Sequence, residues 1–185
     1  MNAVLIRKMV EQGSCPPGCT AAEVVSALAE TRAKNSFEMW GLLSAKKKHA
    51  SGLIEPLGLV SVCLVTTAFA DYLVDALQDS TNGTMDAFSW HAMGTDSTAE
   101  SNTDTTLGTE VESRTDGTQT EGSSTNIYQT VGTISATASH SIVEHGIFTA
   151  SSGGTLLDRS VFSAISLTNG DSIEFTYELT VNAET

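Results

Sequence analysis

Few residues in this chain could do acid–base chemistry. The four histidines stand at positions 49, 91, 140 and 145, and Glu144 directly precedes the last of them. A carboxylate beside an imidazole can tune the imidazole pKa for catalysis. Adjacent residues of a strand point to opposite faces, however, so an extended segment would turn Glu144 away from His145. A structural role for His145 is therefore the preferred interpretation.

His91 and His145 would meet if their two segments pair in one sheet. A zinc site needs three or four ligands, and no cysteine or carboxylate is spaced to complete this pair. A metal-dependent hydrolase built on His91 and His145 is thus a minor hypothesis. No nucleophile-elbow sequence is present. We predict no catalytic residue and no metal ligand, and hence a protein that is not an enzyme.

Motifs for other ligands are missing or incomplete. Cys15 and Cys19 flank two prolines and a glycine, but no second Cys/His pair complements them as a zinc site requires. The total of three cysteines is odd, so we interpret them as free thiols. Neither Gly-rich phosphate-binding pattern occurs, and residues 79–86 lack the alternating ligands of a calcium loop. No cofactor is predicted.

Charge divides the chain into two unlike parts. Residues 1–50 carry seven Lys or Arg against four Asp or Glu, whereas residues 51–185 carry two against eighteen. The two cations of the second part, Arg114 and Arg159, cannot neutralise a row of phosphates. Nucleic acid and anionic membranes are therefore not expected as partners. The positive N-terminal part would suit an acidic neighbour.

Strand patterns dominate the segments that must position these side chains. Apolar and polar residues alternate strictly from Ile173 to Val181, which predicts a strand with one buried face. Turn residues at 151–154 and 169–171 separate neighbouring strands. Short strands at this spacing predict an antiparallel β-sandwich. The other strands are predicted over 59–66, 87–92, 126–136, 141–149 and 156–165.

The apolar run from Leu57 to Ala70 resembles a signal peptide, but it is shorter than the roughly 20 residues of a membrane span. We interpret it as a strand that enters a short helix at the edge of the sandwich. Phe69 and Tyr72 would lie on the apolar face of that helix. Either Thr66 or Thr67 would cap it.

The N-terminal part is predicted to be a helical arm. Thr20 and Glu23 form a capping box, and the apolar spacing that follows predicts a helix over residues 21–34. Its apolar stripe is narrow, so the helix is expected to dock on another surface. We therefore divide the chain into an arm, residues 1–50, and a β-sandwich domain, residues 51–185.

A polar stretch interrupts the predicted domain. Residues 94–124 hold almost no large apolar side chains apart from Leu107 and Val111. Such a composition is typical of disorder when it stands alone. Its position between strands instead predicts a long Ser/Thr-rich surface loop over residues 94–124.

Several segments, in a consistent order from about Leu57 to the end, resemble a family of tailed-bacteriophage virion structural proteins. They include VTTAFADYLVDALQ (65–78), FSWHAMG (88–94), DTTLGTE (104–110), TQTEGSSTNIYQT (118–130), EHGIF (144–148), GTLLDRSVFSAISLT (154–168) and GDSIEFTYELT (170–180). The arm before residue 50 carries less of this resemblance.

The resemblance implies a mainly β, jelly-roll-like sandwich in the virion, assembled in the host cytoplasm. Among the roles open to such proteins, we favour a capsid cement or decoration protein. Its expected partners are the major capsid protein and copies of itself, with a trimer as the favoured oligomer. The alternative is a tail, neck or fibre-associated adaptor, or a module whose polar loops bind a host receptor.

Overall fold

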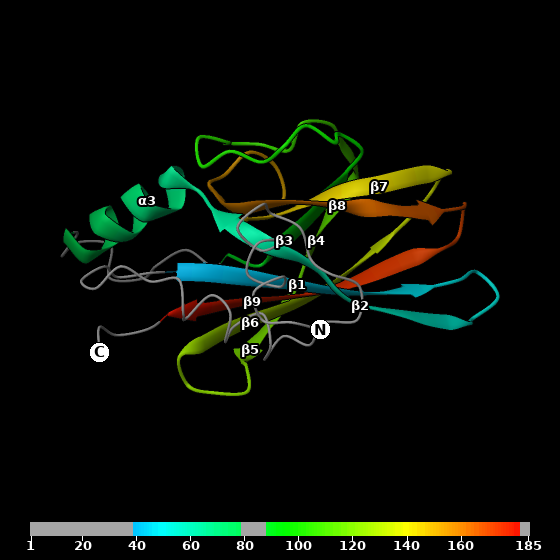
Figure 1. Ribbon diagram of the computed structural model, residues 1–185, viewed down its shortest axis with the longest axis horizontal. Coiled ribbons are helices and arrows are strands. Elements are labelled where there is room, and N and C mark those ends of the chain that lie inside the picture. Colours follow the sequence, from blue (N-terminus) through cyan, green and yellow to red (C-terminus); the bar gives the residue numbers. More distant parts are fainter. Residues whose placement is uncertain (1–38, 79–87, 182–185) are drawn as a thin grey trace, which may run out of the picture.

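The computed structural model describes residues 39–78 and 88–181, and this part of the chain forms nine strands and one helix (Figure 1). The elements are β1 (Met39–Lys48), β2 (Ile54–Val65), α3 (Thr67–Gln78), β3 (Trp90–Gly94), β4 (Glu110–Asp116), β5 (Thr118–Glu121), β6 (Ile127–Ser135), β7 (His140–Phe148), β8 (Leu156–Leu167) and β9 (Ser172–Val181). The prediction of a mainly β protein is confirmed.

All strand pairs are antiparallel, in the order β4-β3-β7-β8-β2-β1-β9-β6-β5. The two strands at the ends of this order, β4 and β5, are separated in the chain only by Gly117. The sheet is therefore nearly closed on itself. Its strands form two layers, with β3, β4, β7 and β8 above and β1, β9, β6 and β5 below in Figure 1. Strand β2 pairs with β1 and, through Leu64 and Val65, with β8.

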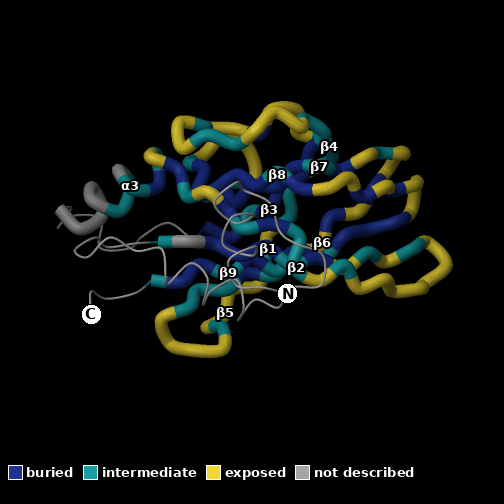
Figure 2. Tube along the Cα trace, viewed as in Figure 1, coloured by how far each residue is buried: buried dark blue, intermediate teal, exposed yellow. Residues whose placement is uncertain are grey.

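The core lies between the two layers and follows from the alternation of the strands (Figure 2). Ile173, Phe175 and Tyr177 of β9 are completely buried, as the strict alternation predicted. Strand β9 pairs with β1 on one side and β6 on the other, so it is central to its layer. The other large side chains buried between the layers include Leu43, Met93, Ile134, Ile142, Ile147, Leu157 and Leu167.

Helix α3 follows β2, as predicted. The Thr66 hydroxyl accepts a hydrogen bond from the Phe69 backbone N–H at 3.2 Å, so Thr66 is the capping residue. The rings of Phe69 and Tyr72 pack edge-on against Phe88, at centroid distances of 5.0 and 5.1 Å. No helix within residues 39–78 and 88–181 is long and apolar enough to cross a membrane. The helix predicted over 21–34 lies outside the described residues.

The sheet begins before the predicted domain boundary at residue 50. Strand β1 pairs along its length with both β2 and β9, and its Leu42 and Leu43 are buried. Residue 50 lies in the turn that joins β1 to β2. The run Lys46–Lys48 gives the end of β1 the appearance of a polar segment. Residues 39–48 thus belong to the sheet and not to a separate arm.

The polar stretch 94–124 also differs from its prediction as one long loop. Residues 110–116 and 118–121 form strands β4 and β5, and the loop that precedes them spans only residues 95–109. Each of these strands is hydrogen-bonded on one side only. The four side chains of β5 are all exposed. Edge strands of this kind need no alternating apolar residues, so the sequence carries no strand signal for them.

Candidate functional site

His91 and His145 meet between the layers, as their predicted strand pairing allows. They lie on the adjacent strands β3 and β7, and His91 Nδ1 is 3.1 Å from His145 Nε2. Both side chains are completely buried. His91 Nε2 is also 3.1 Å from the Thr130 hydroxyl, and the His145 ring lies 4.4 Å from the Phe175 ring. The pair therefore packs as part of the core.

Burial keeps both imidazoles neutral. It lowers the pKa of His91 to about 4, against the opposing effect of the Asp116 carboxylate, and lowers the pKa of His145 well below its usual value. Gly132 makes room for the pair, because a Cβ there would lie 2.5 Å from His91 Cδ2. The described residues contain no group of three or more His, Cys, Asp or Glu that could hold a metal ion. The described residues therefore offer no third metal ligand to the His91–His145 pair, which the hypothesis of a metal-dependent hydrolase requires.

Glu144 points away from His145 and organises the loop over residues 95–109. Its buried carboxylate accepts hydrogen bonds from the backbone N–H groups of Thr109 at 2.8 Å, Gly108 at 3.0 Å and Asp96 at 3.2 Å. Arg159 Nε donates to the same carboxylate at 2.8 Å. A buried carboxylate needs this compensation, because its desolvation is costly. One strand residue therefore fixes a loop of fifteen residues.

Further contacts hold this loop on the body of the protein. Arg159 also pairs with Asp104 of the loop, at 3.1 Å. The Glu100 carboxylate accepts from the Val161 backbone N–H at 3.2 Å, and the Asn102 carbonyl accepts from the Thr67 N–H at 2.7 Å. The Ser/Thr-rich loop is thus anchored to β7, to β8 and to the start of α3. A pocket of about 270 Å³ lies beneath it.

A second buried polar group lies on the other face of β8. Asp158 is completely buried, and neither its carboxyl oxygens nor the Tyr177 hydroxyl has a hydrogen-bond partner of ordinary geometry in the described structure. Burial raises the pKa of Asp158 to about 7. A Cβ at Gly41 would lie 2.7 Å from the Tyr177 hydroxyl and 2.9 Å from Asp158 Oδ2, so the backbone packs closely over both groups.

Cys63 lies beside this group and is a free thiol, as predicted. The Ser160 hydroxyl donates to its sulfur at 3.0 Å. Burial, reinforced by the Asp158 carboxyl, raises the pKa of Cys63 well above its usual value, so the thiol remains protonated and unreactive. The other two cysteines, Cys15 and Cys19, lie outside the described residues.

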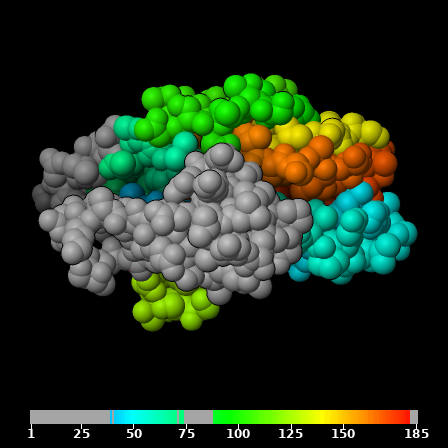
Figure 3. All heavy atoms as spheres, viewed as in Figure 1, coloured from blue at the N-terminus to red at the C-terminus, as the bar shows by residue number. Residues whose placement is uncertain are grey.

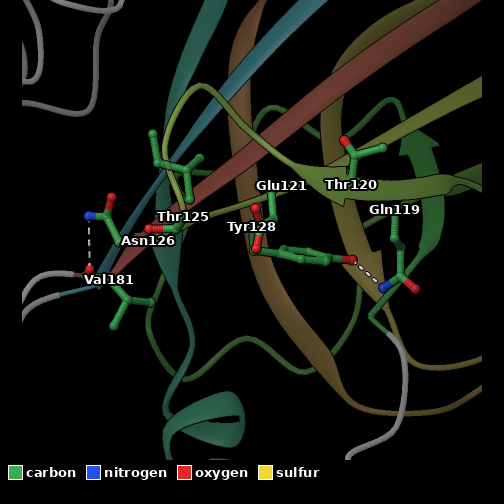
Figure 4. A pocket seen from close by; sticks show the side chains of 8 residues that line it. Gln119, Thr120, Glu121, Thr125, Asn126, Tyr128 and Val181 are labelled. Carbon is green, nitrogen blue, oxygen red and sulfur yellow. Dashed lines mark hydrogen bonds between the residues drawn. The ribbon is translucent and has the colours of Figure 1, made fainter.

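An open groove of about 620 Å³ lies at strands β5 and β6 (Figure 4). Residues 119–121 and 125–128 line it together with Val181. The Tyr128 ring is fixed there, because its hydroxyl donates to the Phe88 carbonyl at 2.6 Å and accepts from Gln119 Nε2 at 2.6 Å. The lining of the groove is mainly apolar, and the exposed Glu121 is one of its lining residues.

Comparisons with known proteins give no relative of this chain. No protein-family model, no curated protein and no solved structure matches it. The sequence and the structure therefore carry the functional argument together.

Proposed function

We propose that this chain is a bacteriophage virion structural protein, and that it acts as a capsid cement or decoration protein. In this role it binds the major capsid protein and neighbouring copies of itself, and so stabilises the head. The observation that supports the proposal best is the burial of the side chains that could do chemistry. His91, His145 and Glu144 are each completely buried, and their contacts stabilise the body rather than face a substrate.

The surface of the body also suits this role. The loop over residues 95–109 presents mostly small polar side chains, yet Glu144 and Arg159 hold its backbone in one conformation. Binding to an ordered loop costs less conformational entropy than binding to a flexible one. Protein interfaces outside their apolar centres are polar and hydrogen-bonded. Such a loop can therefore add contacts to a shell without being reordered.

The finer features of the proposal follow from the sequence. We take the nearly closed sheet as a jelly-roll-like sandwich and residues 1–50, with seven Lys or Arg against four Asp or Glu, as the part that contacts an acidic shell. Self-association into a trimer would give each attachment site three such contacts. The protein would then be found in the virion, after assembly in the host cytoplasm.

Co-sedimentation with capsids tests the proposal. Purified capsids depleted of this chain are incubated with the full-length protein, and bound protein is measured together with the temperature at which the capsids open. We expect saturable binding and a higher opening temperature. Binding to isolated tails or to host cells, without binding to capsids, would contradict the cement role and favour the adaptor or receptor-binding alternative.

A further inference from the structure

The hairpin of β1 and β2 presents two apolar side chains to solvent. Leu53 is 64% exposed and Ile54 57%, and both lie at the tip of the hairpin, which projects at one end of the molecule (Figures 1 and 3). The turn is well ordered, because His49 N–H donates to the Leu53 carbonyl at 2.8 Å and Asp171 accepts from the Ala50 N–H at 2.9 Å. Two adjacent apolar side chains on an ordered tip are suited to anchor a contact.

The same hairpin carries the one strong cation without a partner in the described ranges. Lys46 pairs with Glu174 at 2.6 Å and Lys47 with Asp171 at 3.6 Å, whereas the exposed Lys48 has no ion pair there. The two arginines of the described chain are both held by carboxylates of their own copy. A partner surface with an exposed carboxylate would therefore complement the tip.

The groove at β5 and β6 has the apolar surface and the exposed carboxylate that would complement the hairpin tip. Its volume of about 620 Å³ is within the range, roughly 300–1,000 Å³, of clefts that hold a small-molecule ligand, so it has room for the two side chains of the tip. Ile127 and Val181 supply apolar surface, and Tyr128 is held in place by its two hydrogen bonds. Glu121 is exposed at this site and has no ion pair within the described part of the chain. The turn that follows β5 projects apart from the hairpin tip in Figure 3.

We propose that the hairpin tip of one copy inserts into the groove of a second copy. Leu53 and Ile54 then pack on Ile127 and Val181, and Lys48 lies against Glu121. This inference rests on the self-association in the proposed function and names the surface that produces it. Because tip and groove are different surfaces, the contact is heterologous, and every copy offers one of each. Repetition of such a contact forms a ring when the rotation between neighbouring copies closes, and a trimer is one such ring.

Variants of the full-length chain, studied by analytical ultracentrifugation over a range of concentrations, test this contact. The tip variant carries Leu53→Asp and Ile54→Asp, and the groove variant carries Ile127→Asp. We expect wild type to self-associate, and each variant to raise the dissociation constant at least about tenfold, because an anchoring side chain is lost. Circular dichroism confirms that each variant is folded. The control variant, Leu64→Ser, changes an exposed apolar residue away from the tip and should associate as wild type does.

Mixing the two variants gives the sharpest result. The tip variant keeps its groove and the groove variant keeps its tip, so the mixture should form a one-to-one dimer that neither variant forms alone. Charge reversals at exposed positions avoid any effect on folding. Lys48→Glu and Glu121→Lys should each weaken association, and an equimolar mixture of these two variants should regain affinity through the restored pairing across the contact.

Several outcomes would overturn the inference. They are a wild-type protein that stays monomeric at all concentrations, a tip variant that associates as wild type does, and a variant mixture that forms no dimer. Failure here is distinguishable from failure of the proposed function, because a monomeric protein can still co-sediment with capsids. Self-association through the tip, without binding to capsids, would instead support this contact and refute the cement role.

Discussion

Replacing Asp158 with asparagine should make the protein more stable at neutral and alkaline pH. Burial raises the pKa of Asp158 from 3.8 to about 7, so the folded protein binds a proton there that the unfolded chain releases. Each pKa unit corresponds to about 1.4 kcal/mol. The free energy of unfolding should thus fall by about 4 kcal/mol as the pH rises from about 4 to about 7. An asparagine side chain cannot ionise, so Asp158→Asn should recover up to about 4 kcal/mol at pH 8.

The buried histidines change the free energy of unfolding in the opposite direction over much of the same pH range. Burial lowers the pKa of His91 from 6.5 to about 4, so the unfolded chain binds a proton that the folded protein does not. Stability is therefore lost as the pH falls from 6.5 to about 4, by about 3 kcal/mol for His91 alone. In the wild type the two effects offset each other. In Asp158→Asn the loss on acidification should be visible by itself.

Urea unfolding between pH 4.5 and 8, followed by circular dichroism and tryptophan fluorescence, measures both effects. The control is Glu121→Gln, measured at a protein concentration at which the wild type is monomeric; it removes an exposed carboxylate and should reproduce the wild-type profile. The reasoning is refuted if Asp158→Asn is no more stable than wild type at pH 8. It is equally refuted if the variant and the wild type show parallel pH profiles.

Three further predictions concern single contacts and the chain boundary. Glu144→Gln removes the buried carboxylate that pairs with Arg159 and leaves Asp104 as the only charged partner of Arg159 in the described chain, so it should cost up to about 3–5 kcal/mol in urea unfolding, with faster hydrogen exchange of the loop at residues 95–109. Gly132→Ala places a Cβ against the His91 ring and should cost about 1–3 kcal/mol, seen as a lower melting temperature. Deletion of residues 1–38 should preserve the β-sheet circular dichroism spectrum, whereas deletion of residues 1–50 removes strand β1 and should abolish it.

The sequence predicts those elements whose signals are local. Strand β9 shows its buried face through strict alternation, because one side of it meets the core. The sequence predicts a helix cap at Thr66 or Thr67, and in the structure the Thr66 hydroxyl accepts the hydrogen bond from the Phe69 N–H. The meeting of His91 and His145 follows once both segments are strands of one sheet.

Other features depend on partners that are distant in sequence. The lysines at 46–48 conceal the alternation of strand β1, although its Leu42 and Leu43 are buried and the strand pairs with β2 and β9. Strands β4 and β5 form the ends of the sheet and keep polar side chains in solvent. The partners of Glu144 are backbone N–H groups 35 to 48 residues away, together with the Arg159 side chain. A glutamate inside the apolar strand β7 is the only signal of that network.

Counting copies of this chain in purified virions tests the central claim most directly. Quantitative mass spectrometry gives the ratio of this chain to the major capsid protein. The cement role predicts a copy number in a fixed proportion to the capsid lattice, comparable with that of the major capsid protein. A few copies per virion would place the chain in the neck, tail or fibres, and its absence from virions would contradict a structural role in the particle altogether.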